Sequence, residues 1–264
     1  MKIIILFLMC AALNFSQSAR AQKKEPLSAE ELAKKLANPI ASLISIPFQI
    51  NLDVGAGSTH GSKMVVNIQP VIPITLTPKL NLITRWILPV VSQYDIGSNY
   101  TQESGLGDAV ITGFLSPSGS KITWGVGPAF VIPTATNGKI GGKKWAAGPS
   151  VVALKQSGSW TYGALVNHVF SIAGDNKRSD YSSTFFNPFA TYNWKGGAGV
   201  SLLAEYTHEW KSSTDVLIII PTLSAVTKLG KQTTSFSIGP RLHLMPDNHP
   251  AYGLRAGITL VFPK

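Results

Sequence analysis

Cysteine is almost absent from this chain: its 264 residues contain one, Cys10. A disulfide needs two thiols, and structural zinc sites usually need several thiolates. The chain beyond residue 10 therefore has no disulfide, no cysteine nucleophile and no cysteine-based metal site. Such a chain can cross an oxidising compartment unfolded without forming wrong bridges, but it gains no stability from cross-links.

Long apolar runs are also missing. The run from Ile3 to Leu13 is roughly half as long as an α-helix that crosses a bilayer, and no later segment offers about 18 uninterrupted apolar residues. Lys2 precedes this run and Ala19-Arg20-Ala21 follows it, which is the pattern of a secretory signal peptide with an A-x-A cleavage site. We expect residues 1–21 to be an export signal that is removed before Gln22.

Acidic residues are scarce, with 13 Asp and Glu against 23 Lys and Arg, for a formal net charge of +10. The basic residues are scattered, often at turns such as Lys79, Lys155 and Lys195, and form no basic arm. We therefore do not expect nucleic acid as a partner. Attraction to anionic lipid or to anionic solutes is the better use of this charge.

Strand-like segments fill the chain from about Leu43 onward, separated by clusters of Gly, Ser, Asn, Asp and Pro. We predict about twelve strands: Leu43–Val54, Lys63–Leu76, Lys79–Val91, Gly107–Ser116, Lys121–Pro133, Lys144–Leu154, Trp160–Ala173, Ser182–Trp194, Gly199–Lys211, Val216–Thr227, Gln232–Leu244 and Ala251–Phe262. Short connections follow the even-numbered strands and longer ones follow the odd-numbered strands, as in transmembrane barrels with short periplasmic turns. The predicted fold class is therefore all-β, with residues 43–264 forming a single closed antiparallel transmembrane β-barrel.

The last predicted strand, Tyr252 to Phe262, alternates apolar residues with small or polar ones. Ten steps of about 3.3 Å, tilted by about 40°, would give roughly the 25 Å height of an apolar membrane band. A soluble β-sandwich also alternates, but its outer face would carry more Lys and Glu. The alternation therefore favours a membrane barrel over a sandwich. The expected outward aromatic girdle comprises Trp86, Tyr192, Trp194, Tyr252 and Phe262.

Residues 22–42 are expected to be a periplasmic N-terminal segment. Ser28 and Glu31 have the spacing of a capping box, and apolar residues then recur at helical spacing. A short helix over residues 29–37 is predicted, ended by Pro39, since the residue before a proline avoids the α region. Two alternatives remain open, a solvated helix and a plug that folds into the barrel mouth.

Three Gly-Pro pairs, Gly127-Pro128, Gly148-Pro149 and Gly239-Pro240, fall inside predicted strands. Proline removes a donor from the strand ladder and glycine permits a kink. We expect these pairs to mark bulges or bends shared by related hairpins.

Six blocks of the chain are distinctive: Leu36–Ile44, Asn67–Pro73, Leu80–Arg85, Gly105–Asp108, Leu115–Pro117 and Trp124–Pro128. Together they resemble a family of outer-membrane transporters related to the MetA pathway of phenol degradation. The resemblance spans nearly all of the chain after the signal and implies a barrel with a transport role. It implies no ligand residues.

Charged and amide side chains on the small-residue faces are candidates to line the lumen: Asn81, Arg85, Glu205, Glu209, Arg241, His243 and Arg255. Arginines in such a passage favour anions or carboxylate groups. The simpler interpretation is that Arg and Glu pair across the lumen to satisfy each other, as buried charges must.

A hydrolase would need a serine beside a histidine. His168 falls on an expected outward face, and Ser171 lies three residues on, which places the two on opposite faces of a strand. We assign no catalytic residue, metal site or cofactor. The expected function is passive passage of a small hydrophobic, aromatic or anionic solute across a Gram-negative outer membrane. A lipid-modifying hydrolase and a non-conducting structural barrel are the alternatives. Expected partners are outer-membrane lipids, the solute and, through the C-terminal strand, the barrel-assembly machinery.

Overall fold

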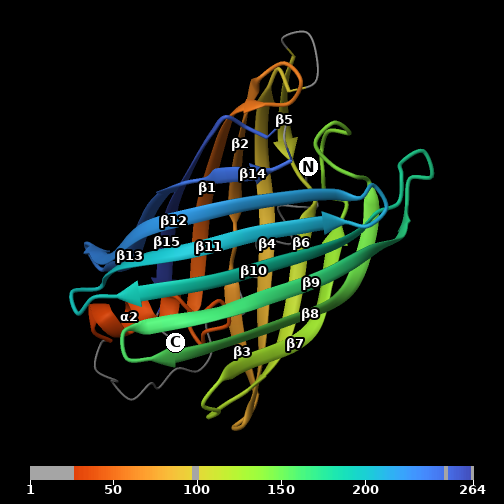
Figure 1. The fold of residues 1–264 in the computed structure, drawn as a ribbon. Helices are drawn as coiled ribbons and strands as arrows, with labels where there is room; N and C mark the ends of the chain where they lie inside the picture. Colours follow the sequence, from red (N-terminus) through yellow and green to blue (C-terminus); the bar gives the residue numbers. More distant parts are fainter. Residues whose placement is uncertain (1–26, 97–100, 247–248, 263–264) are drawn as a thin grey trace.

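Antiparallel strands make up most of the computed structural model, which describes residues 27–96, 101–246 and 249–262. The elements are α2 (Ala29–Leu36), β1 (Ile44–Ala56), β2 (Gly61–Ile68), β3 (Val71–Thr77), β4 (Leu80–Tyr94), β5 (Gln102–Leu106), β6 (Ala109–Pro117), β7 (Thr123–Ile132), β8 (Lys144–Ser157), β9 (Trp160–Gly174), β10 (Ser182–Asn193), β11 (Ala198–Glu209), β12 (Thr214–Leu229), β13 (Gln232–Pro240), β14 (Leu242–Met245) and β15 (Tyr252–Phe262) (Figure 1).

The fifteen strands occupy twelve positions around one closed barrel, because at three positions two consecutive strands lie end to end. We call each of the twelve positions a stave. β2 and β3 both pair with β4, β5 and β6 also both pair with β4, and β13 and β14 both pair with β12. The breaks fall at Gln69-Pro70, Gly107-Asp108 and Arg241. Each of the twelve predicted segments corresponds to one stave, so the predicted fold class is confirmed. The fourth segment, Gly107–Ser116, is too short, because the residues of β5 before it were not predicted as a strand.

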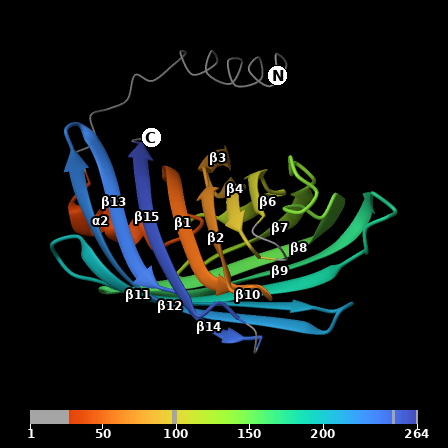
Figure 2. The same ribbon diagram turned by 90° about the horizontal axis from the view of Figure 1, so that it is seen from above.

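Closure joins the two ends of the sheet. β1 pairs with β15 from Ile44↔Phe262 to Val54↔Tyr252, and the pairing of β11 with β12 completes the ring. Figure 2 shows β15 lying between β13 and β1. The closed ring leaves no sheet edge with unpaired backbone groups, which is the condition for a barrel to stand in lipid.

The connections alternate in length as predicted. Tight turns such as residues 158–159 and 230–231 lie at one end of the barrel, and longer connections such as residues 133–143 and 175–181 lie at the other. Figure 1 places α2 at the end with the tight turns. We call this end the turn end and the opposite one the loop end.

The two faces of the wall differ as the alternation requires. Leu52 on β1 pairs with Leu254 on β15, and both are exposed on the outside, as are Trp124, Val151 and Leu202 on other strands. The residues between them, such as Asn51 and Arg255, are buried inside. The outer surface of the barrel is therefore apolar, and the inner surface around Asn51 and Arg255 is polar.

The N-terminal segment packs inside the barrel at the turn end. Ser28 and Glu31 form the predicted capping box, with Glu31 N–H donating to Ser28 Oγ and Ser28 N–H donating to Glu31 Oε2. Leu32 and Ala33 are buried, and α2 packs against β10, β11 and β12. Of the two alternatives left open by the sequence, the structure shows the helix folded against the inner wall.

An apolar cluster inside the barrel holds the segment that follows α2. Ile40 is 2% exposed and packs in one cluster with side chains from the opposite wall. The cluster comprises Ile40, Val71, Ile83, Phe114, Val152, Leu154 and Leu165, with Phe185 and Phe189 packed against it. The core of this barrel thus lies in the lumen, where the N-terminal segment fills part of the space.

The Gly-Pro pairs interrupt strand ladders but do not form bulges. Beside Gly127-Pro128, the β6–β7 ladder resumes in the same register after a gap, between Thr112↔Ala129 and Leu115↔Val126. The ladders beside the other two pairs have similar unshifted gaps. A Cβ on any of the three glycines would lie less than 2 Å from a carbonyl oxygen of the adjacent strand. No register shift falls at the three pairs, so the expected bulges are not found there, whereas the expected bends stay a prediction. Glycine allows the close approach of the neighbouring carbonyl, and proline has no N–H to donate there.

The predicted export signal at residues 1–21 and Cys10 lie outside the described residues, as do Pro263 and Lys264. In the part of the chain that the structure describes, no helix is both long enough and apolar enough to span a membrane.

Barrel closure can be tested by a cross-link between β1 and β15. Ile46→Cys and Leu260→Cys are directly paired, so their Cα atoms fall within the range that a disulfide can bridge. In a Cys10→Ser background we expect this variant to form a disulfide that shifts the mobility of the heat-unfolded chain under non-reducing conditions.

The matched control combines Ile46→Cys with Ile258→Cys, two residues away on the same face, where the diagonal separation of about 7–8 Å exceeds disulfide reach. Cross-linking of the diagonal pair in preference to the direct pair would contradict the register of closure.

Candidate functional site in the barrel lumen

Two cavities lie in the lumen. The first, of about 280 Å³, is bordered by α2 and the residues that follow it, and we call it the helix-side cavity. The second, of about 490 Å³, lies nearer the loop end, and we call it the loop-side cavity. Both are bordered by Gln49, Gln69, Arg85, Leu203 and Arg255. These five side chains separate the cavities, and we call them the partition.

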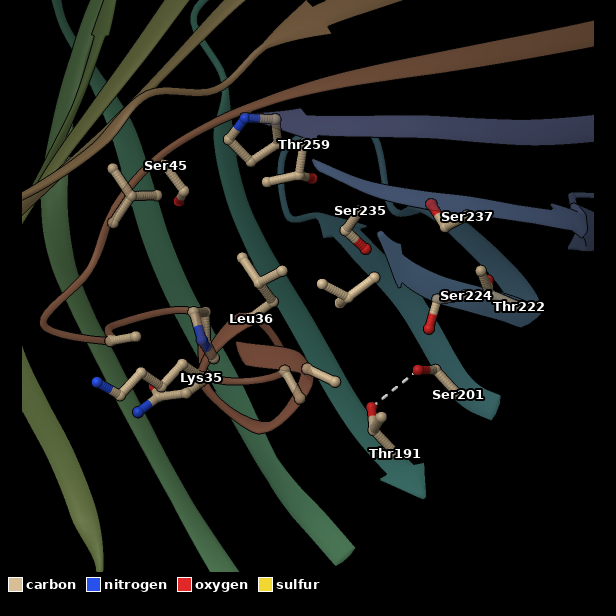
Figure 3. A pocket seen from close by; sticks show the side chains of 18 of the residues that line it. Lys35, Leu36, Ser45, Thr191, Ser201, Thr222, Ser224, Ser235, Ser237 and Thr259 are labelled. Atoms are coloured by element: carbon tan, nitrogen blue, oxygen red, sulfur yellow. Dashed lines mark hydrogen bonds between the residues drawn. The ribbon is translucent and has the colours of Figure 1, made fainter. Parts of the chain in front are cut away.

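The helix-side cavity owes its space to small hydroxyl side chains (Figure 3). Alternate residues of β10 to β13 and β15 point inward as serine or threonine, and Thr191 Oγ1 hydrogen-bonds Ser201 Oγ at 2.9 Å. The hydroxyl residues are Ser45, Thr191, Ser201, Thr222, Ser224, Ser235, Ser237 and Thr259. Their small volume leaves room for α2, while their oxygen atoms keep the surface hydrated or hydrogen-bonded.

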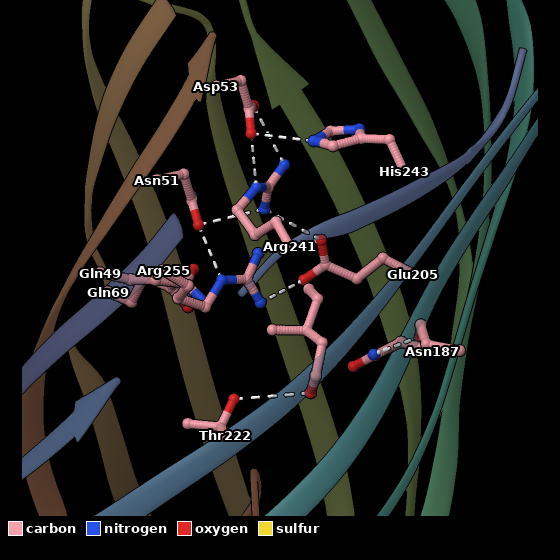
Figure 4. Close-up of polar contacts among 12 residues, drawn as sticks. Gln49, Asn51, Asp53, Gln69, Asn187, Glu205, Thr222, Arg241, His243 and Arg255 are labelled. Carbon is pink, nitrogen blue, oxygen red and sulfur yellow. Dashed lines mark hydrogen bonds and ion pairs between the residues drawn. The ribbon is translucent and has the colours of Figure 1, made fainter. Parts of the chain in front are cut away.

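An ion pair crosses the lumen at the partition (Figure 4). Arg255 on β15 donates through Nη1 and Nη2 to the two carboxylate oxygens of Glu205 on β11, at 2.7 and 3.0 Å. Since β12 and β13 lie between β15 and β11 in the ring, this bond spans the interior. Arg255 Nε also donates to Asn51 Oδ1 at 2.7 Å. The guanidinium is therefore held on two sides.

A second ion pair lies beside the first. Arg241 Nε and Nη2 donate to the two oxygens of Asp53 at 2.9 and 3.3 Å, and His243 Nε2 lies 2.9 Å from Asp53 Oδ1. Arg241 Nη1 lies 3.7 Å from Glu205 Oε2, which links the two pairs. Because each charge has an opposite charge and hydrogen-bond partners, the network meets the condition for keeping charges in a barrel interior.

Arg241 enters the lumen at the break between β13 and β14. Its N–H donates to the carbonyl oxygen of Gly253, and a Cβ at Gly253 would lie 2.7 Å from Cβ of Arg241. Only glycine on β15 allows the arginine to pass at this point. The break between β13 and β14 and the glycine opposite it therefore place Arg241 where it can pair with Asp53.

Arg85 on β4 completes the partition. Its Nη2 donates to Gln69 Oε1 at 2.8 Å, and Gln69 Nε2 donates to Gln49 Oε1 at 2.6 Å. Among the described residues, no carboxylate lies within ion-pair distance of Arg85. Arg85 is the one partition cation held by amide groups alone.

The loop-side cavity has two unlike walls. Asn51, Asp53, Glu205, Arg241 and Arg255 form a polar wall. Strands β2, β4, β6, β7, β9 and β10 supply the apolar residues Val65, Ile87, Val110, Ala129, Val131, Val169 and Phe185, and between them the polar residues Lys63, Asn67, Thr112, Asn167, Ser183 and Asn187. The cavity is therefore amphipathic.

Hydrogen bonds order the connections around the loop end. Asp108 accepts from the N–H groups of Ala135 and Gly142, which ties residues 133–143 to the wall. Lys144 Nζ lies 2.8 Å from Asp180 Oδ1, and this hydrogen bond lowers the pKa of the Asp180 carboxyl. The connections 133–143 and 175–181 are thus fixed to the strands beside them.

The structure brings five of the seven predicted lumen residues together: Arg85, Glu205, Arg241, His243 and Arg255. The other two lie elsewhere. Asn81 Nδ2 donates to Ser118 Oγ near a tight turn, and Glu209 Oε1 accepts from the backbone N–H groups of Ser182 and Lys211 at the loop end. Both residues lie on the inward face of their strands, as the alternation predicts. Alternation does not say how far along the barrel axis a residue lies.

Four partners of these residues were missed by the sequence analysis: Gln49, Asn51, Asp53 and Gln69. A signal for three of them was present. In the first predicted strand, polar residues at 49, 51 and 53 alternate with Phe48, Ile50 and Leu52. The same alternation that identified Arg255 would have identified them.

The predicted girdle residues face outward by strand alternation, at different heights. Tyr192, Trp194 and Phe262 lie near the turn end, and Tyr252 begins β15 at the loop end. The Tyr192 ring packs edge-on against Trp194 and also against Trp160, which was not predicted. Trp86 lies near the middle of β4. A girdle role for Trp86 therefore fits its position less well.

His168 and Ser171 are not brought together. His168 Nδ1 hydrogen-bonds Thr184 Oγ1 at 2.9 Å on the outer face, whereas Ser171 Oγ accepts from the N–H of Tyr181. The two side chains thus have separate partners, as the spacing of three residues predicts.

Comparisons with known proteins find structural likeness only. No family model and no curated protein matches the chain. An outer membrane channel from Pseudomonas putida F1 matches with a TM-score of 0.64 and 15% sequence identity, covering 93% of this chain and 100% of the channel. The Salmonella typhi outer membrane phospholipase matches with a TM-score of 0.46 and 11% identity, covering 89% and 99%. The chain therefore shares the barrel architecture of the Pseudomonas putida channel, and its place in the transporter family related to the MetA pathway stays a prediction.

The Arg255–Glu205 pair should stabilise the fold. Glu205→Gln leaves the buried Arg255 guanidinium without its charge partner, and breaking a buried pair costs about 3 kcal/mol. We expect that loss in the free energy of unfolding, measured by denaturant titration in lipid with tryptophan fluorescence. The double variant Glu205→Gln with Arg255→Gln should lose less than the sum of the single variants.

Glu209→Gln is the matched control, because the glutamine keeps a side-chain oxygen for the two backbone N–H groups. It should cost below about 1 kcal/mol, the usual effect of a substitution away from buried charges. Equal losses at positions 205 and 209 would count against a special role for the cross-lumen pair.

Proposed function

We propose that this chain is a bacterial outer-membrane channel that allows passive passage of a small solute. The observation that carries the proposal is the lumen itself: two cavities in line inside a closed barrel, separated by side chains rather than by backbone. Side chains can change rotamer on a fast time scale without breaking the strand ladder. The partition can therefore open while the wall stays intact.

The outer face supports a place in a membrane. Large apolar side chains are exposed around the ring, including Leu52, Trp124, Val151, Leu202 and Ile238. An exposed apolar surface that encircles a soluble protein would promote aggregation, whereas lipid tails cover it at no cost. Export by the predicted signal at residues 1–21 is part of this proposal.

A solute would enter from the loop end into the loop-side cavity, pass the partition and reach the helix-side cavity. The partition and its neighbours hold three arginines, Arg85, Arg241 and Arg255, against two carboxylates, Asp53 and Glu205. The excess of positive charge favours anions over cations at the narrowest point.

The N-terminal segment forms a second obstacle at the turn end. Its helix, α2, borders the helix-side cavity through Ala33 and Leu36. Ile40, in the residues that follow α2, anchors the segment in the apolar cluster. A solute leaves only when this segment moves or when space opens beside it. We propose that the segment limits conduction rather than closing the barrel permanently.

Release of the anchor should raise the conductance. Ile40→Asp places a charge in the apolar cluster, which expels the segment because an unpaired buried carboxylate is strongly disfavoured. In planar bilayers at symmetric salt, we expect the wild-type chain to conduct weakly and this variant to conduct several-fold more, in proportion to the cross-section that the segment vacates.

Ser42→Asp is the matched control, since Ser42 lies two residues away and is exposed. It should conduct like the wild-type chain. A folded barrel that conducts in none of the three forms would contradict the channel and would favour a structural role.

A further inference from the structure

Arg85 has a charge and several donors for which the described residues supply no partner. A guanidinium carries five N–H donors, and within residues 27–96, 101–246 and 249–262 the Arg85 guanidinium donates to the neutral amide of Gln69. The two carboxylates of the network are already engaged, Asp53 by Arg241 and Glu205 by Arg255. Arg85 is partly buried, and the carboxylate on its side of the network, Glu205, is bound by Arg255, so this site favours an anion from outside the chain.

Thr112 favours an anion at the same place. Thr112 on β6 pairs directly with Arg85 on β4, is buried and borders the loop-side cavity, so its hydroxyl lies within a side chain's reach of the guanidinium. Lys63 borders the same cavity, but it lies far toward the loop end, where it pairs with Asp53 across β1 and β2. The anion site is therefore built on Arg85 with a neutral hydroxyl donor beside it.

The apolar wall distinguishes an organic anion from an inorganic one. Val110, Val131, Val169 and Phe185 border the same cavity as Arg85. An inorganic anion would gain from Arg85 and nothing from these apolar side chains, whereas each buried CH₂ of an organic body contributes about 0.8 kcal/mol. The cavity volume of about 490 Å³ lies in the range of small-molecule sites.

We propose that the loop-side cavity is a binding site for an amphipathic monocarboxylate. Its carboxylate accepts two hydrogen bonds from Arg85, the geometry in which a guanidinium binds carboxylates best. Its apolar body lies against Val131 and Phe185. The proposal rests on the channel function, since the site then lies on the path of the solute and makes its passage saturable.

The test compares a carboxylate with its neutral isostere. The probes are 4-phenylbutanoate and 4-phenylbutanamide, titrated by calorimetry into the full chain in lipid nanodiscs at pH 7.4. We expect the wild-type chain to bind the carboxylate about tenfold or more tightly than the amide, because only the carboxylate forms a charge-assisted pair with Arg85.

Arg85→Gln should remove this preference and leave amide binding within about twofold, and Arg85→Lys should retain part of it through the point charge. Lys155→Gln is the matched control, since it removes one positive charge at the exposed turn end of β8 and should leave the preference unchanged. Val131→Thr should weaken both probes alike, because it changes the apolar wall and no charge.

Equal affinity of the two probes for the wild-type chain would overturn the proposal, and so would a preference that survives Arg85→Gln in a barrel with unchanged melting temperature. The bilayer recordings keep this result separate from the channel function. A barrel that binds the carboxylate selectively but does not conduct overturns the channel alone. A barrel that conducts without carboxylate preference overturns the binding site alone.

Discussion

The ion pair between Arg255 and Glu205 is the interaction on which the interior depends. It joins β15 to β11 across the lumen, and through Asn51 and Arg241 it connects to the wall on both sides. Charges in such a place are tolerated only when each has a partner. The pair therefore determines where the lumen is narrow, which side chains must face one another, and where two cavities remain.

The two cavities occupy the lumen on either side of that network. Small hydroxyl residues at the turn end give space that the N-terminal segment occupies, and the apolar cluster around Ile40 and Phe114 holds it there. At the loop end, an apolar wall faces the charged network across an open cavity. Such a lumen suits solutes with both an apolar and a polar part. Passage would require movement of side chains and of one short segment, while the strand ladder stays closed.

Much of the fold could be predicted from the sequence, because a barrel repeats patterns that are visible within a single strand and its connections. Alternation along each strand and alternation of loop lengths were enough to find twelve staves and their closure. The network was found only in part, because its bonds join residues far apart in the sequence, with 188 positions from Arg241 to Asp53 and 204 from Arg255 to Asn51. Alternation shows that Asn81 and Glu209 face inward, but the height of a residue depends on strand tilt and register, which no single strand encodes. The place of α2 was open for a similar reason, since it depends on space left by side chains of many strands.

The central claim is that the cross-lumen pair both holds the interior together and closes the passage between the cavities. Single-channel conductance of the double variant Arg255→Ala with Glu205→Ala tests it most directly, because both members of the pair are shortened together and Arg241 keeps Asp53 as its partner. The account predicts a folded barrel with a clearly larger unitary conductance than the wild-type chain. A folded barrel with unchanged conductance would show that the path of ions does not cross the partition, and would contradict the account.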